Sequence, residues 1–110
     1  MMTFSQAVNR FAGSLPGTDA YSVLKQNMLV LIKQDPLASS AYFLITGFAR
    51  TYVMLYEDQE VKPEFAKQSQ LTLLGYLDVI NAALQTGNKS ALLDAMNRVV
   101  NDYDKGNKVF

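Results

Sequence analysis

The sequence predicts an all-α protein, a compact bundle of four to five helices built as a single domain over residues 1–110. Apolar residues recur at helical spacing in each long segment, Gly and Pro fall where those segments begin and end, and no alternating strand pattern competes. A chain of 110 residues has the size of one ordinary domain. Its 49% hydrophobic and 18% charged residues are typical of a globular protein.

Capping residues mark the first two helices. Thr3 and Gln6 have the T-x-x-Q spacing of a capping box, so a short helix is predicted from there to Gly13. After a Leu-Pro-Gly turn, Thr18 or Asp19 is expected to cap a second helix that continues to about position 34.

The third helix is predicted from Pro36 to about Gln59, because Asp35-Pro36 places an N-cap acid before a proline at the first helical position. One broad face is apolar: Leu37, Ala41, Leu44, Ile45, Phe48, Tyr52, Leu55 and Tyr56. A narrow polar strip follows, made of Ser39, Thr46, Arg50 and Glu57, and beyond it lie Phe43, Gly47 and Met54. Such a long, apolar helix is either central to the bundle or shared with a partner.

The last two helices are bounded by Pro and Gly. Lys62-Pro63-Glu64 starts a fourth helix, which Gly87 ends, and Asn88 or Lys89 starts a fifth, which ends at Gly106. The fifth helix is expected to bury Leu92, Ala95, Met96, Val99 and Tyr103.

Two glycines inside helices predict how the third and fourth helices meet. Gly47 and Gly75 are equally far along the chain from Val61, so they lie at the same height of an antiparallel hairpin. Because glycine inside a helix costs about 1 kcal/mol relative to alanine, a close crossing of the two helices is the expected reason. The alternative is that one glycine makes room for a ligand or for a partner's side chain.

Several classes of chemistry are missing from the sequence. The chain has no Cys and no His, which removes thiolate nucleophiles, the commonest general base and the commonest transition-metal ligand. Asp102, Asp104 and Gly106 do not have the spacing of a calcium loop. No phosphate-binding loop or nucleophile motif is present, so we expect no enzyme, no cofactor and no metal.

Charge and hydropathy restrict the partners. The formal net charge is zero and no run of Lys or Arg occurs, so nucleic acid is not an expected partner. Residues 1–10 lack the pattern of a signal peptide. The longest uncharged stretch stops at Arg50 and is shorter than the roughly 20 apolar residues of a membrane span. A cytoplasmic, bacterial protein is expected, and the lack of Cys suits that compartment.

The leading functional hypothesis is a noncatalytic protein–protein interaction module, whose partner is another protein or a second copy in a homo-oligomer. Arginine and aromatic residues are enriched at binding hot spots. The outer surface of the third and fourth helices is therefore the expected binding surface. The candidate interface comprises Phe43, Gly47, Arg50, Tyr52, Met54, Tyr56, Leu71, Gly75 and Val79. The alternatives are that Arg50 only faces solvent near Glu57, and that Tyr, Phe and Met side chains line a small-molecule cavity between the two helices.

Short segments carry a likeness to one known family. Asp35-Pro36-Leu37, Tyr42-Phe43-Leu44 and the closing Asp102–Gly106 segment with Phe110 resemble pediocin-type bacteriocin immunity proteins, as does the order of the helices. The resemblance implies a small cytosolic four-helix bundle whose third helix, fourth helix and tail recognise a membrane-receptor complex. The neutral charge and the expected fifth helix depart from that pattern.

Overall fold

The computed structural model describes residues 1–110, and it confirms the all-α prediction. Five α-helices and one short 3-10 turn make up the fold, and there is no strand. In chain order they are α1 (Phe4–Ala12), α2 (Thr18–Gln34), the turn at Pro36–Ala38, α3 (Ser39–Tyr56), α4 (Pro63–Thr86) and α5 (Lys89–Lys105).

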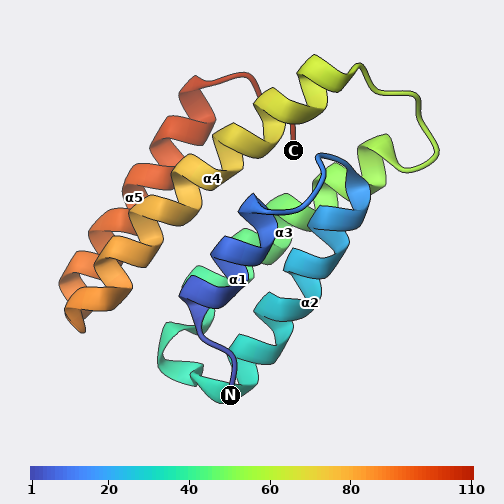
Figure 1. Cartoon of the computed structure of the whole chain (residues 1–110). Helices are drawn as coiled ribbons and strands as arrows, with labels where there is room; N and C mark the ends of the chain where they lie inside the picture. Colours follow the sequence, from blue (N-terminus) through green and yellow to red (C-terminus); the bar gives the residue numbers. More distant parts are fainter.

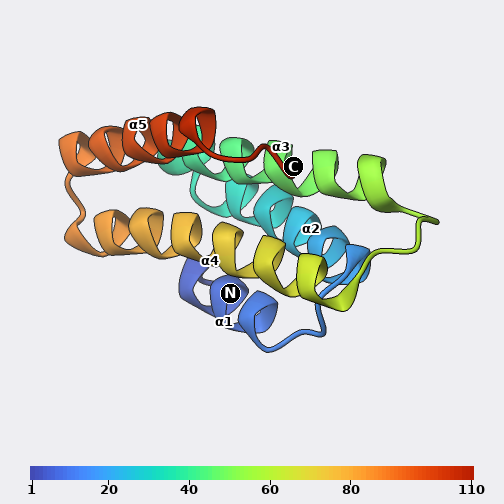
Figure 2. The same ribbon diagram turned by 90° about the horizontal axis from the view of Figure 1, so that it is seen from above.

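The helices form two antiparallel pairs joined by α1. Helices α2 and α3 pack along their lengths, as do α4 and α5, and α1 contacts both α2 and α4 (Figures 1 and 2). Helices α3 and α4 also run in opposite directions, joined by the loop at residues 57–62 (Figure 2). Their main packing partners are nevertheless α2 and α5, rather than each other.

One core runs through all five helices, because each helix turns an apolar stripe inward. The fully buried large side chains include Phe11, Tyr21, Leu24, Met28, Ile45, Tyr52, Leu73, Leu77, Ile80 and Val99. Burial of each such side chain contributes about 1.5–3 kcal/mol to folding. The stripe predicted for α5 is confirmed, with Ala95 and Val99 buried and its other members packed against the core.

The predicted caps are partly confirmed. Thr3 Oγ1 accepts a hydrogen bond from the Gln6 backbone N–H at 3.1 Å, and Gln6 Oε1 accepts one from the Thr3 N–H at 2.9 Å, which completes the capping box. The N-cap of α2, however, is Gly17, and no side chain caps this helix. The expectation for Thr18 or Asp19 was therefore wrong: both residues already lie in the first turn.

The start of α3 also differs from the prediction. Three residues of 3-10 turn come first, and the Asp35 carboxylate does not cap the helix. Instead Oδ2 of Asp35 accepts a hydrogen bond from the Tyr42 hydroxyl at 2.8 Å. Because a 3-10 turn has three residues per turn, Leu37 is directed away from the apolar face and is 84% exposed. At the other end α3 stops at Tyr56, and Asp58 adopts a left-handed backbone with φ of 63°.

The polar strip predicted on α3 is wrong at one position. Thr46 is buried, and its hydroxyl donates a hydrogen bond at 2.9 Å to the Tyr42 carbonyl one turn earlier. That internal partner removes the cost of burying the hydroxyl. Leu55, predicted on the buried face, is instead about half exposed.

Candidate interaction surface

One line of exposed side chains runs along α3. Phe43 is 63% exposed and Met54 is 74% exposed, although both are large apolar residues. Arg50 lies between them and is exposed, and Gly47 is half-buried. The four positions are separated by four, three and four residues, so they share one side of the helix. We call Phe43, Gly47, Arg50 and Met54 the α3 stripe.

Arg50 has no ionic partner within the chain. The expected approach to Glu57 does not occur, since the ion pairs of the structure are Arg98–Asp102 at 3.9 Å and Lys108–Asp104 at 3.7 Å. No hydrogen bond involves the Arg50 guanidinium either. Its five N–H donors are therefore available to a group outside this chain.

A second line of exposed residues runs along α4. Leu71 is 50% exposed, and Gly75, Asp78 and Ala82 are exposed as well. We call these four residues the α4 stripe. Asp78 takes part in no ion pair. Val79, which the sequence placed among the interface candidates, is half-buried and packs against the core.

Two candidate tyrosines lie inside the bundle instead of on its surface. Tyr52 is 1% exposed and stacks on Tyr21 of α2, with ring centroids 3.7 Å apart. Tyr56 is half-buried and contacts both Tyr52 and Phe65 through its ring. Burial raises the pKa of Tyr21 and of Tyr52, and the nearby phenols raise both further. Tyr52 therefore packs α3 against α2 on the side of α3 opposite the stripe.

The glycines do not mark a close helix crossing. A Cβ added at Gly47 or at Gly75 would meet no atom within 4 Å, so neither glycine is required by contacts inside the chain. The prediction that Gly47 and Gly75 allow a close crossing of α3 and α4 was therefore wrong. Both glycines carry the helix-interior cost of about 1 kcal/mol, and both lie on the exposed stripes.

The hollow nearest to the expected ligand cavity lies where α3 ends and α4 begins. It measures about 430 Å³ and is lined by Leu55, Tyr56, Gln59, Glu60, Val61, Lys62 and Phe65. A smaller hollow of about 230 Å³ shares Tyr56 with it and reaches Tyr52 and Gly17. No methionine lines either hollow.

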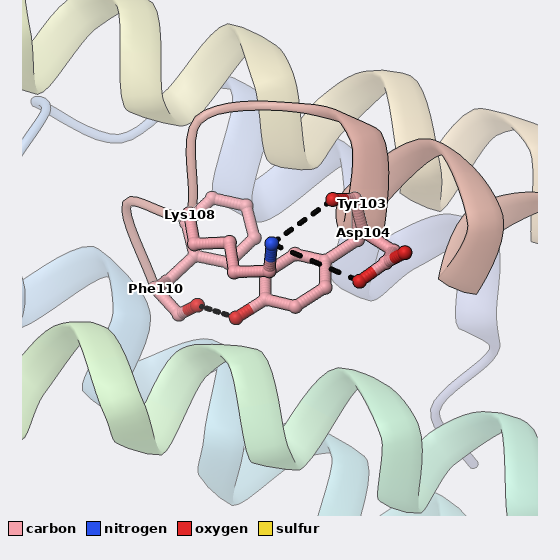
Figure 3. A network of polar contacts seen from close by, with 4 residues as sticks. All are labelled: Tyr103, Asp104, Lys108 and Phe110. Atoms are coloured by element: carbon pink, nitrogen blue, oxygen red, sulfur yellow. Dashed lines mark hydrogen bonds and ion pairs between the residues drawn. The ribbon is translucent and has the colours of Figure 1, made fainter.

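Residues 106–110 fold back over the junction of α3, α4 and α5. The Tyr103 hydroxyl donates a hydrogen bond at 2.7 Å to the Phe110 carbonyl, and Lys108 Nζ donates one at 2.9 Å to the Asp104 carbonyl (Figure 3). The Phe110 ring is 3% exposed and packs edge-on against Phe48 of α3, at 5.3 Å between centroids. Sequence reasoning did not foresee this closure.

The structure holds no group of three or more carboxylates placed to bind a metal ion. None of its helices is long and apolar enough to cross a membrane. Comparisons with protein-family models, curated proteins and solved structures found no match.

Proposed function

We propose that this chain is a noncatalytic helical interaction module whose partner-binding surface is the α3 stripe. The observation that carries the proposal is the exposure of Phe43 and Met54 on either side of the unpaired Arg50. Phenylalanine, methionine and arginine are all enriched at protein interfaces, and arginine is also enriched at binding hot spots. Exposed apolar residues that gather on one line favour an interface more strongly than single scattered ones.

The arrangement behind the stripe also suits binding. The opposite side of α3 is fixed in the core by Ile45, Phe48 and Tyr52. A surface held on a rigid helix loses little conformational entropy when a partner binds. We also propose that the module acts in the cytoplasm of a bacterial cell, a compartment that a chain without Cys suits.

Site-specific photo-crosslinking in the native cell tests the proposal. A photoreactive amino acid replaces Phe43 or Met54, and a matched control replaces Leu93 of α5, which is 58% exposed. We expect a discrete protein adduct from positions 43 and 54 and none from position 93. If positions 43 and 54 yield no discrete adduct, or the same adducts as position 93, the α3 stripe is not the binding surface.

The likeness to bacteriocin immunity proteins supports a narrower form of the same proposal. In that form the recognised partner is a membrane-receptor complex, and α3, α4 and residues 106–110 contact it. Expression of this chain in a bacterium sensitive to a pediocin-type bacteriocin is expected to protect the cells. Equal killing with and without the chain, across the bacteriocins of that type, would remove the narrower form while leaving the interaction module in place.

The hollows at the end of α3 give a second candidate function, the binding of a small molecule. Tyr52 lines the smaller hollow, and its buried hydroxyl has no hydrogen-bond partner. A ligand with an acceptor oxygen that displaces the side chains covering this hydroxyl would satisfy the donor. Native mass spectrometry of the protein as purified from cells tests the idea, since a bound ligand adds a discrete mass that Tyr52→Phe and Val61→Trp both reduce.

A further inference from the structure

The two exposed stripes repeat one pattern of residues. Each begins with an apolar residue, continues with a glycine and a charged residue, and ends with a second apolar residue. The separations of four, three and four residues are the same in both. In order, Phe43, Gly47, Arg50 and Met54 on α3 match Leu71, Gly75, Asp78 and Ala82 on α4.

The charged members of the two stripes are opposite in sign. Arg50 and Asp78 are both exposed, and neither takes part in an ion pair or a side-chain hydrogen bond within the chain. They do not meet inside one molecule, since no ion pair joins them and α3 and α4 are not main packing partners. Each stripe therefore presents a free charge that the other stripe complements.

We infer that a second copy of this chain covers these surfaces, with the α3 stripe of one copy packed against the α4 stripe of another. Arg50 then pairs with Asp78 of the second copy. This inference rests on the proposed function and names the partner for the same surface. It also accounts for the α4 stripe, which the proposed function leaves without a role.

The spacing brings the two charges together in either direction of the helices. When the stripes run in the same direction, Arg50 lies opposite Asp78 of the second copy. When they run in opposite directions, Arg50 lies opposite Gly75, and Asp78 follows three residues away, which is about 4.5 Å along the helix. Both distances are within reach of the long arginine side chain.

Pairing of like stripes is disfavoured by the same charges. If two α3 stripes met, the two Arg50 guanidinium groups would lie within about one helical turn of each other. If two α4 stripes met, the two Asp78 carboxylates would lie equally close. Such like-charge contacts oppose association, whereas the unlike pairing brings opposite charges together. Charge complementarity therefore favours pairing of the α3 stripe with the α4 stripe over pairing of two like stripes.

This arrangement explains why each stripe contains a glycine. Because Gly47 and Gly75 have no side chain, the facing helix can approach closely, and the stem of a charged side chain can lie across the gap. A two-fold dimer in which each α3 stripe packs on the other copy's α4 stripe uses both stripes at once, whereas a single contact leaves one stripe of each copy free. In the second case association closes into a ring or continues as the concentration rises.

Charge reversal tests the pairing in the full chain. The variants are Arg50→Asp, Asp78→Arg and the double variant with both changes, and the control is Asp94→Arg, an exposed acid of α5 without an ion pair. Sedimentation velocity measures association from micromolar to millimolar concentration. Circular dichroism and urea unfolding verify that each variant is folded, as expected for exposed positions.

We expect the wild type and Asp94→Arg to associate alike, and each stripe variant to raise the dissociation constant about tenfold or more at low salt. The double variant is expected to recover wild-type association, because the swapped charges attract again. A monomeric wild type at millimolar concentration overturns the inference, as does an Asp78→Arg variant that associates normally. Adducts from positions 43 and 54 to a different protein would then still support the proposed function.

Discussion

The rings of Tyr21 on α2 and Tyr52 on α3 stack face to face, with centroids 3.7 Å apart and planes 7° from parallel. Aromatic pairs usually prefer offset or edge-on contacts, so the surrounding core determines this geometry. The Phe11 ring contacts Tyr21 edge-on at 5.1 Å, which ties α1 to the same cluster. The stack holds α2 against the side of α3 that lies behind the α3 stripe.

Tyr21→Phe is expected to stabilise the protein. The Tyr21 hydroxyl is buried and has no hydrogen-bond partner, and a buried unpaired polar group costs about 1–3 kcal/mol. Its removal leaves the stacked ring in place, so we expect the free energy of unfolding to rise by about 1 kcal/mol. Urea unfolding measures the change. A loss of stability would show that the hydroxyl has a partner in solution.

Stability is expected to fall at alkaline pH. Burial raises the pKa of Tyr21, Tyr52 and Tyr76 above the ordinary value of 10.0, and at Tyr76 the charges of Asp102 and Tyr103 add to the effect. The unfolded chain releases these protons near pH 10, whereas the folded chain retains them, so the free energy of unfolding decreases as the pH rises past about 10. Urea unfolding between neutral and strongly alkaline pH checks this, and the decrease should be smaller in Tyr21→Phe. An equal decrease in stability in the wild type and in Tyr21→Phe would show that groups other than Tyr21 cause the pH dependence.

Alanine substitutions at two glycines are expected to have opposite effects. Gly47 lies inside α3 with open space around it, so Gly47→Ala should raise the stability of the monomer by about 1 kcal/mol. Gly87 ends α4 with a left-handed φ of 67°, so Gly87→Ala should lower stability by about 1 kcal/mol. Thermal unfolding of dilute samples compares the two. Destabilisation by Gly47→Ala would indicate a close internal contact at that position.

The closure by residues 106–110 is expected to contribute to stability. Phe110→Ala removes a buried ring that contacts Phe48, Tyr76 and Tyr103, and we expect a loss of about 3–5 kcal/mol. Tyr103→Phe removes only the hydrogen bond to the Phe110 carbonyl and should cost about 1 kcal/mol. Urea unfolding of both variants gives the two values. Wild-type stability in Phe110→Ala would mean that this segment is undocked in solution.

The sequence predicted those features of the fold that depend on nearby residues. The Thr3–Gln6 capping box and the end of α4 at Gly87 are local, and the helical spacing of apolar residues identified most of the buried face of α3 and the buried stripe of α5. Features that depend on distant residues were missed. The Asp35 carboxylate accepts a hydrogen bond from the Tyr42 hydroxyl instead of capping α3. The docking of Phe110 depends on aromatic rings from three helices.

The candidate surface was predicted in part for the same reason. Exposure of Phe43, Arg50 and Met54 follows from their shared side of α3, which the sequence shows. Tyr52 could not be separated from them, because its burial depends on α2, which contributes Tyr21. Asp78 was not among the candidate interface residues. Its match to Arg50 emerged once the structure showed both helices exposed at these positions.

Backbone NMR at increasing protein concentration tests the central claim most directly, because it reports every amide of the stripes at once. On association we expect the amide signals of Gly47, Arg50, Gly75 and Asp78 to shift or broaden most, while those around Leu93 on α5 stay constant. Signals that change around Leu93 instead, or signals that remain constant along both stripes up to millimolar concentration, would contradict the claim that these surfaces bind a second copy.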